Sequence, residues 1–205
     1  MAKQQVFYIH GGSAYSKYED FLQELRTKTL RDLPGQEVFK KWPSTLREDL
    51  GEEYEVFMPS MPNSQNAKYR EWKIWFERHF EYFKDDIVLV GWSQGAYFLV
   101  KYLLENELPV KIKALILLAA PFDAAGLERE DGGDFRFDIN RVGELESVTA
   151  NIFILHSTDD PIVPFQAAEK YKLALPKARL VTFTDKNHFL VESLPELLDL
   201  ITEVA

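Results

Sequence analysis

The sequence predicts an α/β protein in which helices flank a doubly wound, mostly parallel sheet of six strands. Short apolar runs rich in β-branched and aromatic residues alternate along the chain with longer segments of helical periodicity. Several of the short runs are apolar almost without interruption, which is typical of strands that helices cover on both faces. The chain has 205 residues, no internal repeat and no Gly/Ser-rich linker, so we expect one domain over 1–205.

The apolar runs and the helical segments place each element. Strands are expected at 6–10, 54–58, 87–90, 112–119, 152–156 and 180–184. Helices are expected over 16–31, 66–84, 94–107, 165–175 and 188–203, with a short one at 43–50. Residues 121–149 are expected to form a short cap insertion. Because the carboxyl ends of parallel strands share one edge of the sheet, functional groups are expected in the loops there.

Composition excludes several classes of function. The chain has 33 acidic and 24 basic side chains and a formal charge of −9, which argues against binding to nucleic acid or to anionic membranes. It has no cysteine, hence no disulfide, no thiolate nucleophile and no Cys-ligated metal. No apolar run is long enough for a secretory signal or a membrane span. We therefore expect a cytoplasmic protein.

The strongest motif is Gly91-Trp92-Ser93-Gln94-Gly95, which follows the strand at 87–90 and precedes the helix at 94–107. A G-x-S-x-G sequence between a strand and a helix is typical of a nucleophilic serine on a strained turn. The glycines are needed because the chain crowds on either side of that turn. The alternative is an ordinary glycine-punctuated turn. We take Ser93 as the candidate nucleophile.

A serine nucleophile needs a base, and the base needs a carboxylate to orient it. In this type of fold the chain order is serine, acid, histidine, which selects His188 after the last strand. The other three histidines are expected to be structural: His10, His79 and His156.

The acid is expected in the Asp159-Asp160-Pro161 segment after the fifth strand. Asp160 is preferred over Asp159 because Pro161 restricts the backbone of the residue before it. Asp185 lies only three residues before His188 and is expected to be a turn residue.

Two backbone N–H groups are expected to form an oxyanion hole. One is that of Gln94, at the start of the helix after Ser93, and the other belongs to the His10-Gly11-Gly12-Ser13 turn after the first strand. Gly12 is the first candidate in that turn and Ser13 the second. An isolated HGG could also be an ordinary turn or a phosphate cradle. It lacks the G-x-G-x-x-G of a dinucleotide site, so no cofactor is expected.

The segments GWSQGA, HSTDDPIVP and NHF, with HGG at the front, resemble the α/β-hydrolases. More narrowly, the chain resembles the small serine hydrolases typified by retinoblastoma-binding protein nine, and MPSMPNS at 58–64 resembles the bacterial members of that group. The resemblance covers nearly the whole chain. It implies a Ser93–Asp160–His188 triad and a minimal cap. Asn187 stands where these proteins usually have glycine before the histidine, which could alter the shape of that loop.

Together these observations predict a cofactor-free serine hydrolase, most similar to a carboxylesterase. It would cleave small carboxylic esters or thioesters through an acyl-enzyme intermediate. The alternative is a protein-binding module that retains the fold with little physiological catalysis, because the namesake of the group is a protein binder. The sequence identifies neither the natural substrate nor a protein partner.

The insertion at 121–149 carries eight acidic residues against three arginines. A cap of this charge facing the site would repel anionic substrates. We therefore expect short neutral acyl esters to be preferred.

Overall fold

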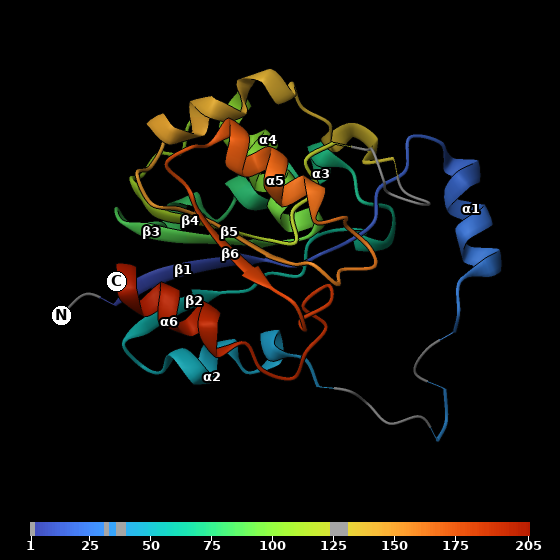
Figure 1. Cartoon of the computed structure of the whole chain (residues 1–205), viewed down its shortest axis with the longest axis horizontal. Coiled ribbons are helices and arrows are strands. Elements are labelled where there is room, and N and C mark those ends of the chain that lie inside the picture. Colours follow the sequence, from blue (N-terminus) through green and yellow to red (C-terminus); the bar gives the residue numbers. More distant parts are fainter. Residues whose placement is uncertain (1–2, 31–32, 36–39, 124–130) are drawn as a thin grey trace.

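A six-stranded sheet forms the centre of the molecule (Figure 1). The computed structural model describes residues 3–30, 33–35, 40–123 and 131–205. The strands are β1 (Gln4–Ile9), β2 (Tyr54–Phe57), β3 (Ile87–Trp92), β4 (Ile112–Leu118), β5 (Ile152–Ser157) and β6 (Arg179–Phe183). Their order is β2-β1-β3-β4-β5-β6 and every neighbouring pair is parallel. The predicted fold class is confirmed, and each strand ends within two residues of the predicted bounds.

Helices cover both faces of this sheet, as a doubly wound topology requires (Figure 1). On one face lie α3 (Tyr69–Glu77), α4 (Gln94–Glu105) and α5 (Gln166–Ala174). On the other lie α2 (Leu46–Leu50) and α6 (Pro195–Val204). In the described part of the chain, no helix combines the length and the apolar composition that crossing a membrane demands.

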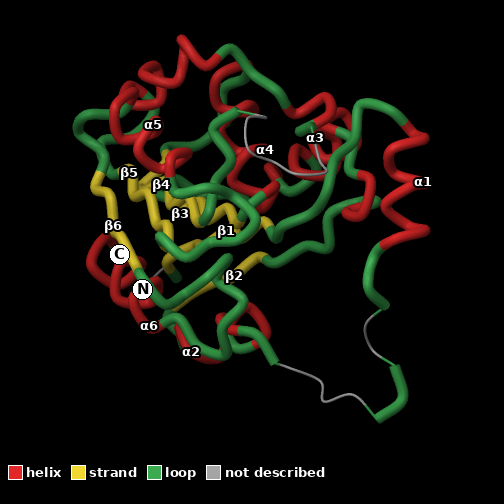
Figure 2. Tube along the Cα trace, turned by 45° about the vertical axis from the view of Figure 1, so that its right-hand side comes forward, coloured by secondary structure: helices red, strands yellow, loops and turns green. Residues whose placement is uncertain are grey.

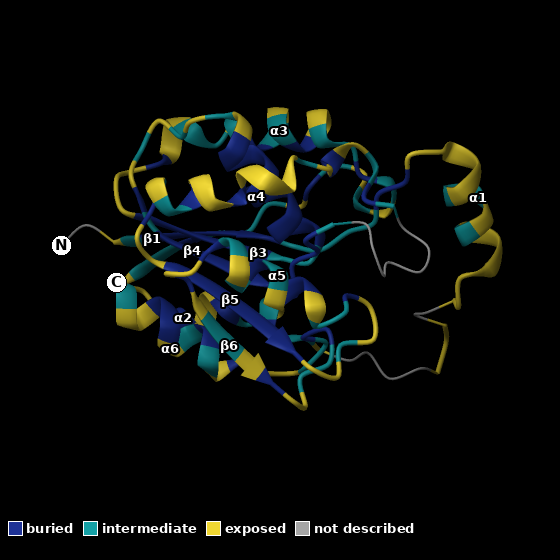
Figure 3. Ribbon diagram, turned by 45° about the horizontal axis from the view of Figure 1, so that its top comes forward, coloured by how far each residue is buried: buried dark blue, intermediate teal, exposed yellow. Residues whose placement is uncertain are grey.

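The strands divide the core into two layers because successive side chains point to opposite faces. Phe7 and Ile9 pack beneath α3 and α4, whereas Val6 and Tyr8 pack against the α2 and α6 side. The central strands are therefore buried throughout, which explains their uninterrupted apolar sequences (Figure 3). In α4 every residue except Glu105 is buried, so the helix that follows Ser93 is enclosed on all sides.

The helix α1 (Tyr18–Thr27) stands away from the rest of the molecule (Figure 2). None of its residues is buried, and Tyr18 and Leu25 are exposed. It follows the loop that leaves β1 and ends before the described part of the chain is interrupted. Its exposure distinguishes it from the other helices, which pack on the sheet.

Several predicted helix boundaries were wrong, two of them because of a tertiary or backbone constraint. The last helix begins at Pro195 rather than 188, because Asn187 and Phe189 have left-handed φ angles of 41° and 55° that a right-handed helix excludes. The helix α3 ends at Glu77 because the chain then turns through η3 (Phe80–Tyr82) to pack two aromatic rings on Phe76. The short helix is split into η1 (Trp42–Ser44) and α2.

The described part of the 121–149 insertion contains η4 (Gly133–Phe135) and η5 (Ile139–Ser147). The segment at 131–134 meets the loop after β1, where Asp131 accepts a hydrogen bond from the backbone of Ser16. By contrast, η5 packs along α4 and α5. Residues 124–130 lie outside the described residues. That the whole insertion caps the sheet edge stays a prediction.

Replacement of Phe76 by alanine is expected to lower the free energy of unfolding by about 3–5 kcal/mol. The ring is fully buried and packs edge-on against Phe7, Phe98 and Tyr102, so its removal leaves a cavity under the sheet. Ile74→Ala on the same helix is the matched control, because Ile74 is 53% exposed and should cost about 0.5 kcal/mol or less. Urea denaturation of both variants checks this; equal losses would contradict the packing described.

Candidate active site

Ser93 lies on a sharp turn between β3 and α4, with φ of 53° and ψ of −118°. An L-residue rarely adopts this conformation, and such strain persists only where the surroundings enforce it. A Cβ on Gly91 would lie 2.5 Å from the Cα of Ala96, and one on Gly95 would overlap the carbonyl oxygen of Ile9. Both glycines are therefore required by close backbone approach, as the sequence predicts.

Backbone hydrogen bonds on both sides fasten this turn. The Ser93 N–H donates to the carbonyl of Leu118 on β4 (2.8 Å), and the Tyr97 N–H donates to the carbonyl of Ser93 (3.0 Å). The N–H groups of the first helical turn, beginning with Gln94, have no intrahelical acceptors. They lie at the positive end of the helix dipole, next to the serine. Negative charge that develops beside Ser93 would be stabilised there.

His188 and Asp160 are brought together from the loops after β6 and β5. His188 Nδ1 lies 2.8 Å from Oδ2 of Asp160, whose side chain has no exposed surface. The other oxygen, Oδ1, accepts hydrogen bonds from the N–H groups of Ile162 (2.8 Å) and Val163 (3.0 Å). One oxygen of the carboxylate is thus held by its own turn, and the other contacts the imidazole.

Asp159, the second candidate acid, has a different environment. Its Oδ1 accepts hydrogen bonds from the hydroxyl of Ser157 and from the N–H of Asn187 (2.9 Å). The Ser157 hydroxyl in turn accepts from the N–H of Lys186 (3.2 Å). Asp159 therefore contacts the backbone next to His188 and not the imidazole. The chain spacing gave no signal for this contact.

Ser93 and His188 both line one cavity of about 580 Å³ at the carboxyl edge of the sheet. Its other walls include Gly12, Gln94 and the apolar side chains of Trp92, Ile162, Val163 and Leu190. No hydrogen bond joins Ser93 to His188 among the described residues. Such bonds are often long in ligand-free enzymes and shorten when substrate binds.

The HGG turn packs against the turn that carries Ser93. A Cβ on Gly11 would lie 3.9 Å from Ser93 Oγ, and one on Gly12 would lie 2.7 Å from the carbonyl oxygen of Ser64. The Ser13 N–H already donates to that carbonyl of Ser64 (2.8 Å). In the described residues no backbone acceptor engages the Gly12 N–H. Of the two candidates in this turn, Gly12 rather than Ser13 has an N–H that is available to a substrate oxygen.

The other three histidines make structural contacts. His10 Nε2 accepts from the Met61 N–H (2.8 Å), so Nδ1 carries the proton and donates to the Gly11 carbonyl (2.6 Å). His79 Nδ1 lies 2.8 Å from the Trp75 carbonyl. His156 is fully buried; its Nε2 lies 2.9 Å from the Val163 carbonyl and 3.5 Å from Asp160 Oδ2. The contact of His156 with Asp160 was missed by sequence reasoning.

The described acidic residues of the insertion are mostly paired. Four carboxylates lie near basic side chains: Asp123 with Lys170, Asp131 with Arg136, Glu144 with Arg141 and Glu146 with Lys177. None of residues 131–149 lines the cavity that contains Ser93. The expected repulsion of anionic substrates therefore has no support in the described part of the insertion.

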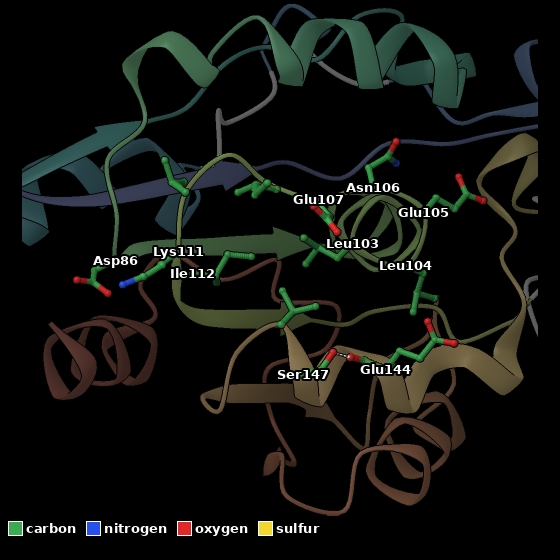
Figure 4. A pocket seen from close by; sticks show the side chains of 13 residues that line it. Asp86, Leu103, Leu104, Glu105, Asn106, Glu107, Lys111, Ile112, Glu144 and Ser147 are labelled. Atoms are coloured by element: carbon green, nitrogen blue, oxygen red, sulfur yellow. Dashed lines mark hydrogen bonds between the residues drawn. The ribbon is translucent and has the colours of Figure 1, made fainter.

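A larger cavity, of about 790 Å³, lies elsewhere (Figure 4). It is lined by the end of α4 and by Asp86, Lys111 and Ile112, at the amino ends of β3 and β4. Ligand sites in open parallel sheets lie at the carboxyl ends of strands, so size does not identify the site here. The described residues include no cluster of three or more His, Asp or Glu side chains that could hold a metal ion.

A profile of the serine hydrolase family matches residues 35–201. The chain belongs to the serine hydrolase family. The match includes Ser93, Asp160 and His188, whereas β1 and the HGG turn of this serine hydrolase precede it. No curated protein matches the chain.

Solved structures with the same fold include the ydeN gene product of B. subtilis, with a TM-score of 0.75, 20% identity and 98% of each chain covered. Est1E from Butyrivibrio proteoclasticus, with ferulic acid bound, has a TM-score of 0.61 and 17% identity over 99% of this chain and 88% of its own. The monoacylglycerol lipase of Paleococcus ferrophilus has a TM-score of 0.61 and 14% identity over 99% and 95%. At these identities the likeness shows the α/β-hydrolase fold.

The pH dependence of stability is expected to report on His156. Burial lowers the pKa of its imidazole below the ordinary value, and the nearby Asp160 carboxylate opposes this less strongly. The unfolded chain therefore takes up a proton near pH 6.5 that the folded protein excludes. His156 favours folding above that pH, and this contribution falls as the pH drops below it, by at most about 1.4 kcal/mol per unit.

The measurement is the free energy of unfolding between pH 5 and 7.5 for the wild type and for His156→Gln. His188 and Asp160 lie beside His156 and are present in both proteins, so the comparison isolates the change at position 156. The variant should show the shallower decline toward acid. Parallel curves would contradict the expectation.

Proposed function

We propose that this serine hydrolase cleaves small carboxylic esters or thioesters through an acyl-enzyme intermediate, with Ser93 as nucleophile, His188 as base and Asp160 as acid. The observation that carries the proposal is the 2.8 Å contact between His188 Nδ1 and the buried Asp160, in the wall of the cavity that also contains Ser93. A histidine oriented in this way presents Nε2 to a serine hydroxyl.

In acylation, His188 takes the proton of Ser93 Oγ as the oxygen attacks the carbonyl carbon of the substrate. Asp160 keeps the Nδ1 proton of the imidazole in place and stabilises the imidazolium that forms. The tetrahedral intermediate then collapses, the C–O or C–S bond breaks, and His188 gives its proton to the leaving group. In deacylation, water repeats this sequence and releases the acid.

The negative oxygen of both tetrahedral intermediates needs donors that are already in place. We assign these to the backbone N–H groups of Gln94 and Gly12. The first lies at the amino end of α4, and the second has no backbone acceptor among the described residues. Ser13 is the weaker candidate because Ser64 already accepts its N–H.

Two features support an ester or thioester of modest size. The cavity of about 580 Å³ falls within the ordinary range for small-molecule sites, and its walls combine apolar side chains with a few polar groups. The neighbour named as a monoacylglycerol lipase suggests the same class of bond. A panel of activated esters, thioesters and amides, assayed with purified protein, would test the class directly.

Ser93→Ala is expected to abolish turnover and leave the fold intact, with kcat lower by several orders of magnitude. The same variant should lose rapid labelling by a fluorophosphonate probe. A variant that keeps more than about a tenth of the wild-type esterase activity would exclude Ser93 as nucleophile. A wild type that neither labels nor hydrolyses any ester of the panel would favour the protein-binding alternative.

Asp160→Asn and Asp159→Asn are expected to differ strongly. The first removes the charge that stabilises the His188 imidazolium, and kcat should fall by about three orders of magnitude or more. The second keeps an oxygen that can accept from Asn187, so kcat should fall by about tenfold or less. Steady-state kinetics of the two purified variants on one ester decide between them; a greater loss in Asp159→Asn would reverse the assignment.

A further inference from the structure

The loop that carries His188 is strained on both sides of the histidine. Asn187 has φ of 41° and Phe189 has φ of 55°. Asparagine tolerates the left-handed region, but phenylalanine rarely enters it, so the conformation of Phe189 is strained. Contacts outside the loop must therefore hold this conformation.

Two tryptophans supply hydrogen bonds to consecutive carbonyl groups of this loop. The indole N–H of Trp92 donates to the carbonyl of His188 (3.0 Å), and the indole N–H of Trp42 donates to the carbonyl of Phe189 (3.1 Å). The Trp42 backbone N–H also donates to the carbonyl of Val191 (3.0 Å). Together the two indoles therefore fix the orientation of the two peptide groups after His188, those that contain the His188 and Phe189 carbonyls.

The two indoles are themselves held in place. Their rings lie 6.1 Å apart, and the Trp42 ring packs edge-on against Tyr8 of β1. Trp92 precedes Ser93 directly and its ring lies 5.9 Å from that of His188. Trp92 thus joins the turn that carries the nucleophile to the loop that carries the base.

We propose that Trp42 and Trp92 are positioning residues, whose indole N–H groups hold the His188 loop so that the imidazole meets both Asp160 and Ser93. This inference rests on the proposed triad. Each indole N–H acts through the backbone of the loop. Before the histidine, Asp159 accepts the N–H of Asn187, and after it the Asn187 side chain accepts the N–H of Leu190. The tryptophans bind the carbonyls of the two residues between.

Trp75 provides a control. The indole N–H of Trp75, on α3, is buried without a hydrogen-bond partner in the described part of the chain. Trp75→Phe therefore makes the same chemical change as Trp92→Phe or Trp42→Phe but removes no hydrogen bond. It measures what the loss of an indole ring alone does to the protein.

The experiment compares steady-state kinetics of the three Trp→Phe variants on one activated ester, with the folded fraction measured for each. Trp92→Phe and Trp42→Phe should lower kcat by about tenfold or more, because small displacements of catalytic groups are costly, with KM within about twofold. Trp75→Phe should stay within about twofold of the wild type. Equal kcat in all three variants, per folded molecule, would overturn the proposal.

A second measurement separates positioning from a general structural role. In a His188→Ala background there is no imidazole to position, so adding Trp92→Phe should change the residual rate by less than about twofold. The same tenfold loss in that background would overturn the proposal. If Trp92→Phe fails to fold, β-(3-benzothienyl)alanine at position 92 keeps the ring shape and lacks only the N–H. A wild type inactive on every ester would instead contradict the proposed function itself.

Discussion

The buried carboxylate of Asp160 is the group on which the arrangement of the carboxyl-end loops depends. A charge with no exposed surface is tolerated only when hydrogen bonds replace its water. Two of these come from its own turn, at Ile162 and Val163, and the third comes from His188. Since the last partner belongs to the loop after β6, the need to satisfy this carboxylate draws two separate loops together beside the cavity.

Strained backbone lies at the same edge of the sheet, at Ser93 and in the loop around His188. The rest of the fold can hold this strain because it is rigid. The strands β3 and β4 are enclosed on both faces, and α4 is buried along almost its whole length. A turn between such elements cannot relax without disturbing the core, so the serine stays in a conformation that a free peptide would leave.

The strands, the strained turn at Ser93 and the contact between Asp160 and His188 could be predicted because their signals can be read along the chain. Apolar runs give the strands, glycine spacing gives the turn, and the order of the residues along the chain limits the choice of acid and base. Three features could not be predicted, because they depend on which loops meet in space: the start of α6, the contacts of Asp159 and the role of the insertion. Trp42 is the clearest case: it lies 147 positions before Phe189, whose carbonyl it binds.

The contacts that hold this site reach mainly backbone groups of the loops. Ser64 and Leu118 accept backbone N–H groups of the HGG and Ser93 turns, and Asp159 accepts that of Asn187. Side chains that face the cavity, such as Ile162 and Leu190, are not needed for these bonds. Such side chains can therefore change without moving the backbone that carries the proposed reacting groups. The fold constrains the chemistry, and the lining of the cavity is left to select the substrate.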